Sequence, residues 1–84
     1  MDIASNVKLR LDKGYRFSIS QEVDRRDLVE VALLHGKRFV HCGEWCVWWV
    51  GEEYDGEVVR FVDAHDVLEL LNCAKEYVYI KDNR

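Results

Sequence analysis

The sequence predicts an α+β fold in which a mainly antiparallel sheet carries two packed helices. Three observations predict it. Apolar and polar residues alternate near the start of the chain, two stretches with helical apolar spacing begin at capping residues, and glycine-containing turns separate short apolar runs. The expected order of elements is ββαβββαβ.

The first two strands are expected to form a hairpin. Apolar side chains in this part of the chain fall on odd positions only, before and after a short turn, which is the period of a half-buried strand. Asp12, Lys13 and Gly14 suit a three-residue loop with the glycine in the left-handed conformation, and this loop pairs Leu9 with Phe17. One long strand with Lys13 facing inward is the alternative.

A helix is predicted next, from Gln21 to His35. Ser20 can cap its start, and apolar side chains recur along it at helical spacing. Gly36 stands where a left-handed C-cap residue belongs. We therefore expect this helix to pack on the sheet.

Three strands are then expected to form a meander, at residues 39–42, 45–50 and 58–62. Gly43-Glu44 and Asp55-Gly56 are typical of two-residue hairpin turns between such strands. Neither face of this meander shows the polar alternation of a sheet with one solvated side.

The chain is expected to end with a helix from Ala64 to about Lys75, capped by Asp63, and a last strand from Tyr77 to Ile80. With 84 residues it has the length for one hydrophobic core. We therefore expect a single compact domain over residues 1–84.

Cysteine usage and charge narrow the class of protein. Three cysteines at irregular spacing argue against a disulfide framework and indicate a reducing compartment. No apolar stretch is long enough to span a bilayer, and no secretory signal is visible. A cytoplasmic location and no membrane partner are therefore expected. The chain is acidic, with a formal net charge of −4, and most of the acidic excess lies in its second half.

The predicted meander supplies the first candidate binding site. Its registers bring Trp45 and Trp49 to one face, and exposed aromatic and arginine side chains are typical of protein interfaces. The alternative is that other elements cover both faces. The predicted protein-interaction residues, which include the acidic turn, are Arg38, Val40, Trp45, Val47, Trp49, Glu52, Glu53 and Asp55.

The first hairpin supplies the second candidate site. The side of the hairpin opposite its apolar residues carries basic side chains that can track phosphates. A basic solvent-facing side is also ordinary for a strand at the edge of a sheet. The predicted nucleic-acid-binding residues are Lys8, Arg10, Lys13 and Arg16.

No metal site, catalytic site or cofactor is predicted. Cys42 and Cys46 lie close to His41 in sequence, but the predicted register sends the two cysteines to opposite faces of the meander. The chain contains no nucleophile elbow, phosphate-binding loop or zinc-helix motif. An enzyme is therefore not expected.

The predicted function is that of a small non-catalytic protein-interaction module. It would act as an inhibitor or accessory subunit on a larger macromolecular complex, in the manner of the small acidic proteins that phages and plasmids direct against host complexes. The predicted partner is a protein of unknown identity, and a homodimer would use the same aromatic face. The alternative is a nucleic-acid-binding domain that uses the basic hairpin.

Overall fold

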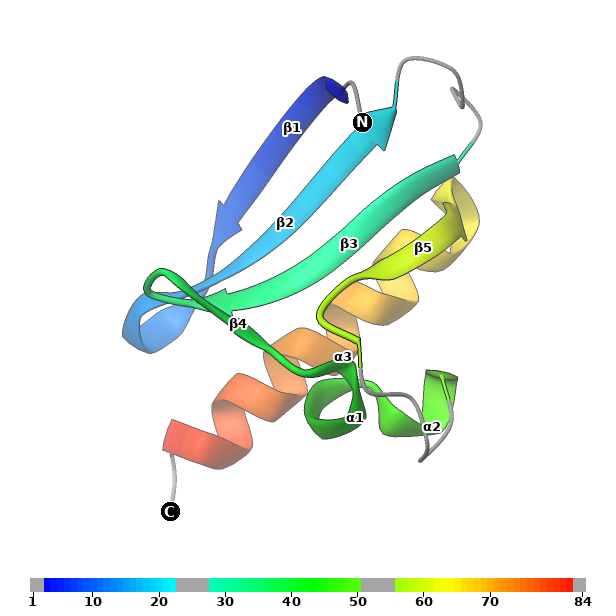
Figure 1. The fold of residues 1–84 in the computed structure, drawn as a ribbon. Coiled ribbons are helices and arrows are strands. Elements are labelled where there is room, and N and C mark those ends of the chain that lie inside the picture. Colours follow the sequence, from blue (N-terminus) through cyan, green and yellow to red (C-terminus); the bar gives the residue numbers. More distant parts are fainter. Residues whose placement is uncertain (1–2, 23–27, 51–55, 83–84) are drawn as a thin grey trace.

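The computed structural model describes residues 3–22, 28–50 and 56–82, and shows an α+β fold in which one long helix packs across an antiparallel sheet (Figure 1). The strands are β1 (Ile3–Arg10), β2 (Tyr15–Glu22), β3 (Leu28–His35), β4 (Arg38–Val40) and β5 (Val59–Asp63). The helices are a 3-10 turn at Asp12–Gly14, two short helices α1 (Cys42–Trp45) and α2 (Val47–Val50), and the long helix α3 (Ala64–Asp82).

The sheet is built around β3. Strands β1, β2 and β3 lie side by side in this order. Both β4 and β5 pair with the edge of β3 that faces away from β2. β4 pairs with the last residues of β3, whereas β5 pairs with its first half. All of these pairings are antiparallel. The central strand therefore has neighbours on both edges.

The predicted hairpin of β1 and β2 is confirmed. Leu9 lies opposite Phe17, as the alternation predicts. The amide of Leu11 donates to the carbonyl of Tyr15 at 2.8 Å, and Gly14 adopts a φ of 81°. The alternative of one long strand is wrong, because the chain reverses at this turn.

The predicted helix from Gln21 to His35 is wrong. Residues 28–35 form strand β3, and residues 23–27 lie outside the described part of the chain. β3 buries consecutive side chains from Val31 to Leu34, because it is the central strand and has paired neighbours on both edges. A strand buried in this way loses its alternation, so its apolar residues also fit a helical stripe.

The predicted meander is also wrong in its middle. β4 is short, and the strand predicted at residues 45–50 is replaced by α1 and α2. The amide of Cys46 donates to the carbonyl of Cys42 at 2.9 Å, so Gly43 and Glu44 lie in a helical turn and not in a hairpin. Cys42, Trp45 and Cys46 stand at helical spacing, and all three are buried.

The third predicted strand of the meander exists as β5, although it pairs with β3. The turn predicted at Asp55-Gly56 lies largely outside the described residues.

The predicted helix at Ala64 is confirmed and is longer than expected. It continues to Asp82, so the last strand predicted at Tyr77 to Ile80 is wrong. Leu70, Ala74 and Val78 are buried at four-residue intervals, and this stripe carries the helix through the predicted strand. The observed order is therefore ββββααβα. No helix in the described ranges is long and apolar enough to cross a membrane.

The hydrophobic core lies between α3 and one face of the sheet. Phe17, Leu33 and Leu70 are fully buried there, and α3 contacts β2, β3 and β5. The ring of Trp45 packs edge-on against Phe17, with ring centroids 6.0 Å apart. The helices therefore lie on one side of the sheet (Figure 1).

Candidate functional site

The face of the sheet opposite α3 is called the open face, because no described helix or strand packs over it (Figure 1). The strand registers determine which side chains it presents, since residues directly opposite each other share a face. The registers place on it Asn6, Lys8, Arg10, Arg16, Ser18, Ser20, Leu28, Glu30, Ala32, Leu34, Phe39 and Asp63.

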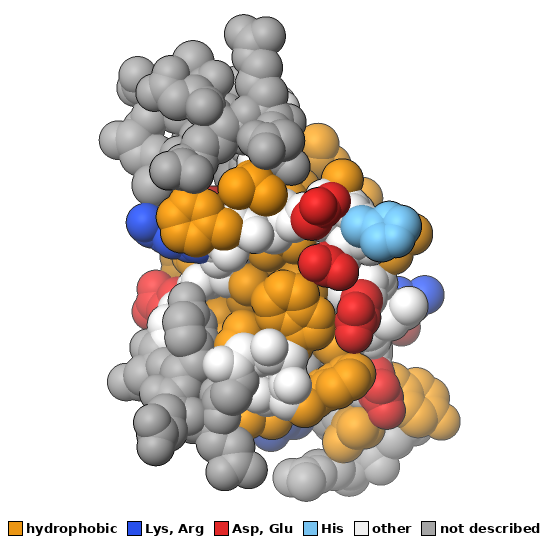
Figure 2. Space-filling model, turned by 90° about the vertical axis from the view of Figure 1, so that its right-hand side faces the viewer, with side chains coloured by type: hydrophobic (Ala, Val, Ile, Leu, Met, Phe, Trp, Pro, Cys, Tyr) orange, Lys and Arg blue, Asp and Glu red, His pale blue; other side chains and the backbone are white. Residues whose placement is uncertain are grey.

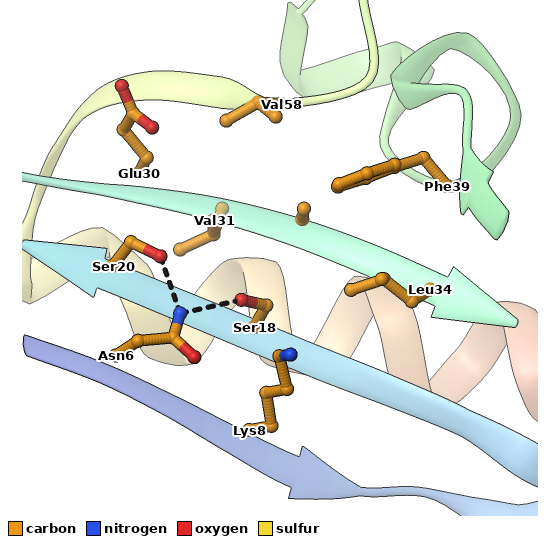
Figure 3. A pocket seen from close by; sticks show the side chains of 10 residues that line it. Asn6, Lys8, Ser18, Ser20, Glu30, Val31, Leu34, Phe39 and Val58 are labelled. Carbon is orange, nitrogen blue, oxygen red and sulfur yellow. Dashed lines mark hydrogen bonds between the residues drawn. The ribbon is translucent and has the colours of Figure 1, made fainter. Parts of the chain in front are cut away.

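A polar network joins β1 and β2 on this face. The side-chain amide of Asn6 donates to the hydroxyl oxygens of Ser18 and Ser20 at 3.1 and 2.6 Å (Figure 3). The same amide nitrogen lies 3.3 Å from the carbonyl of Ile19. A shallow hollow of about 320 Å³ lies beside this network, and Lys8 stands at its margin. The network therefore fixes the edge strand that carries the basic residues.

Three cationic side chains gather on β1 and β2. Arg10 lies directly opposite Arg16, and Lys8 is two residues away on the same face. Like charges directly opposite each other destabilise a strand pair. This arrangement conflicts with a purely structural role, and such conflicts are typical of functional sites.

The two arginines border a second hollow, of about 370 Å³, at the end of the sheet where the turns lie. The guanidinium of Arg16 donates to the carbonyl of Gly36 at 2.6 Å, which anchors that side chain. Gly14 and Gly36 also line the hollow, and the amide of Gly36 donates to the carbonyl of Gly14 at 3.0 Å. Arg10 is exposed, so one arginine is held by the turn and the other faces solvent.

The carboxylate of Glu30 is paired within the sheet. Its Oε1 atom lies 3.4 Å from Nε of Arg60 on β5. Arg60 is mostly exposed, whereas Glu30 is largely covered. Asp63, opposite Leu28, is a second acid on this face. The two acids lie on β3 and β5, whereas the three cations lie on β1 and β2.

The structure brings together three of the four residues predicted for nucleic-acid binding. Lys8, Arg10 and Arg16 share the open face, and Lys13 lies in the adjoining turn with a φ of 58°. Sequence reasoning missed Phe39, which is 43% exposed. Its place on the open face follows from its pairing with Leu34, and no local pattern revealed that pairing.

The predicted aromatic protein-interaction face is not an exposed surface. Trp45 is only 3% exposed and Val40 is also buried, because both pack in the core between α3 and the sheet. Val47 and Trp49 are partly buried. The hypothesis of an exposed Trp45 and Trp49 patch is therefore wrong for Trp45.

The other members of that predicted site are dispersed. Arg38 is exposed and lies opposite His35, on the helix side of the sheet. Glu52, Glu53 and Asp55 lie outside the described residues. The tryptophan that the structure does expose is Trp48, at 68%. In a strand over residues 45–50, Trp48 would lie on the face opposite Trp45 and Trp49, so the predicted aromatic face does not include it.

The cysteines are buried and free of disulfides. A hydrogen bond with Cys46 lowers the pKa of the Cys42 thiol, and the same bond together with burial raises the pKa of Cys46. Burial raises the pKa of Cys73, and the nearby carboxylates of Glu69 and Glu76 raise it further. No group of three or more potential ligands within the described ranges is arranged to hold a metal ion.

Comparison of the chain with protein-family models, with curated proteins and with solved structures finds no match. The geometry of the open face therefore carries the functional argument.

Proposed function

We propose that this protein is a non-catalytic binding module that contacts the sugar-phosphate backbone of a single-stranded nucleic acid through its open face. The proposal rests on the Arg10 and Arg16 pair, with Lys8 beside it on the same surface. Lysine and arginine side chains that neutralise phosphates release condensed counterions, and this release supplies most of the affinity of non-specific binding.

The location of the charge supports this proposal. The whole chain is acidic, with a net charge of −4, so a phosphate backbone can be attracted only by a local concentration of cations. Lys8, Arg10 and Arg16 provide that concentration. Residues two apart on a strand are separated by about 6.8 Å, so Lys8 and Arg10 can contact different points along one backbone.

The uncharged part of the open face suits single-stranded binding. Single-stranded nucleic acids bind to surfaces that combine cations with aromatic rings, on which bases stack. Phe39 is exposed on this face, and the hollow beside Asn6 and Lys8 includes Phe39 in its lining. A duplex has no free base faces to offer such a ring, which favours a single strand.

The expectation of a protein-interaction module stays a proposal as well, but it needs different residues, because Trp45 is buried.

The proposed setting is cytoplasmic, since three buried free cysteines suit a reducing compartment. A role as an inhibitor or accessory subunit of a larger complex is compatible with a module that occupies a nucleic acid without acting on it.

The proposal is tested by fluorescence anisotropy with labelled single-stranded DNA and RNA and with a labelled duplex, over a series of salt concentrations. The test variant is Arg10→Glu with Arg16→Glu. The control is Arg38→Glu with Lys81→Glu, which changes the net charge equally; both control residues are exposed, Arg38 on the helix side of the sheet and Lys81 on α3.

We expect the wild-type protein to bind the single strands at low salt, and the test variant to lose at least about tenfold in affinity, because two phosphate contacts are removed. The slope of log affinity against log salt should fall by about 1.4 for a single strand. The control should keep most of its affinity. Absence of binding at low salt, or equal losses in the two variants, would contradict the proposal.

A further inference from the structure

A groove on the helical side of the molecule carries a separate surface. It lies between the short helices and α3 and has a volume of about 410 Å³. Figure 2 shows hydrophobic side chains on this part of the molecule, with acidic side chains in a column beside them. The groove is lined by Glu44, Trp45, Val47, Trp48, Cys73, Glu76, Tyr77 and Ile80.

The groove exposes large apolar side chains. Trp48 on α2 is 68% exposed, and Ile80 near the end of α3 is 49% exposed. The buried side chains of Trp45 and Cys73 form part of its lining, so its base belongs to the folded core. Exposed apolar residues next to a preformed hollow mark a surface where a partner can gain binding energy, and tryptophan is enriched among the residues that provide it.

The charged side chains that line the groove are acidic, and one cation, Lys81, lies 5.5 Å from the ring centroid of the lining residue Tyr77. Glu44 and Glu76 are its charged lining residues. Glu69 stands seven residues before Glu76, two helical turns away on the same stripe of α3. Burial raises the pKa of Tyr77, and the nearby carboxylate of Glu44 raises it further. Burial likewise raises the pKa of Cys73, and Glu69 and Glu76 add to this shift. The described side chains at the groove therefore carry more negative than positive charge.

We propose that this groove binds a short segment of a partner protein that carries lysine or arginine next to one large apolar side chain. The apolar side chain would pack against Trp48 and Ile80, and the cations would face Glu44 and Glu76. Complementary charge of this type steers association and selects the partner. A nucleic acid is excluded as the occupant, because the carboxylates repel phosphates. This inference is independent of the open face, which lies on the opposite side of the sheet.

The experiment selects from a phage-displayed library of random peptides of about 12 residues on the immobilised full chain, and measures the most enriched peptide by anisotropy. Trp48→Ala is the apolar test variant. Its control is Tyr79→Ala, because Tyr79 is an aromatic residue of α3 that is equally exposed, at 69%, and lies outside the groove. Glu44→Gln with Glu76→Gln is the charge test, and Asp12→Asn with Glu57→Gln is its control.

We expect the enriched peptides to carry net positive charge and at least one large apolar residue. Trp48→Ala should weaken the selected peptide at least about tenfold, as truncation of a binding hot spot does. Glu44→Gln with Glu76→Gln should also weaken binding of the selected peptide, by a factor that increases as the salt concentration falls. Both control variants, and Arg10→Glu with Arg16→Glu, should bind the peptide as the wild type does.

Four results would overturn the proposal. These are an absence of enrichment, enrichment of neutral or acidic peptides, equal binding to Trp48→Ala, and light scattering that shows a dimer of the full chain which Trp48→Ala dissociates. In the last case a second copy would be the occupant.

Circular dichroism of each variant verifies that the fold is retained, which the exposure of the substituted side chains leads us to expect.

Discussion

The two faces of the sheet are made by the same strands but have different chemistry. On the covered face, Phe17 and Leu33 are fully buried under α3. On the open face, the next residues of the same strands include Arg16 and Ser18 on β2, and β1 adds Lys8. Because side chains alternate along a strand, one set of residues can stabilise the fold while the other remains free to bind. Substitutions on the two faces should therefore affect different measurements.

The largest effect on stability is expected on the covered face. Leu33→Ala should lower the free energy of unfolding by about 2 to 5 kcal/mol, because it removes a fully buried side chain and leaves a cavity. Lys8→Ala, on the open face, should change it by less than about 0.5 kcal/mol. Urea denaturation followed by tryptophan fluorescence measures both. A loss below about 1 kcal/mol for Leu33→Ala would show that the covered face does not form the core.

Alkaline pH should destabilise the protein through the buried thiol of Cys73. The unfolded chain releases the Cys73 proton near the ordinary pKa of 9.0, whereas burial and two nearby carboxylates raise the pKa in the folded protein. The free energy of unfolding should therefore be unaffected by Cys73 below that pH and fall above it, by at most about 1.4 kcal/mol per pH unit for this group.

Urea denaturation at about pH 8 and about pH 10 measures this fall, with Cys73→Ala as the comparison. Other buried groups with raised pKa values, including Cys46, contribute to the slope of both proteins. The Cys73→Ala protein should lose less stability between the two pH values than the wild type. Equal losses would show that the Cys73 thiol does not keep its proton in the folded state.

A smaller effect is expected at the turn that supports the open face. Gly36 has a φ of 65°, and a Cβ atom there would meet nothing within 4 Å. Gly36→Ala should therefore cost about 1 kcal/mol through backbone strain alone. Urea denaturation measures this cost. Since the carbonyl of Gly36 accepts the Arg16 guanidinium, a change in the turn should also weaken oligonucleotide binding. A variant as stable as the wild type would contradict the left-handed conformation of Gly36.

Local patterns in the sequence predicted the parts of the fold that depend on near neighbours. The alternation before and after Gly14 predicted the hairpin and its register, and the capping residue Asp63 predicted the start of α3. The amide of His65 donates to the carboxylate of Asp63 at 3.1 Å, which confirms the cap. These features depend on residues close in sequence, so a single chain contains enough information to predict them.

The remaining errors concern tertiary contacts. Strand β3 carries buried apolar residues on both of its faces, such as Val31 and Ala32, so the pattern fits a helix as well as a strand. The apolar residues at positions 45–50 fit both periods. The backbone hydrogen bond from Cys46 to Cys42 and the core contact of Trp45 with Phe17 show that the helical one is correct. The choice between strand and helix decides which tryptophans face solvent. In the helical arrangement Trp45 is buried and Trp48 is exposed.

The basic part of the candidate site was predictable, and its aromatic part was not. Lys8, Arg10 and Arg16 follow from the polar side of the hairpin. Phe39 reaches the same surface only because β4 returns to pair with β3, which is a contact that no local pattern specifies. The cations therefore follow from local sequence, whereas the complete open face requires the three-dimensional fold.

The most direct test of the division between the two faces is Arg10→Glu alone, measured for both stability and oligonucleotide affinity. A glutamate opposite Arg16 replaces a cross-strand repulsion with an attraction. The account predicts that the free energy of unfolding rises by about 0.5 kcal/mol while single-strand affinity falls several-fold. A variant that is less stable, or that binds the oligonucleotide as well as the wild type, would contradict the assignment of binding to the open face.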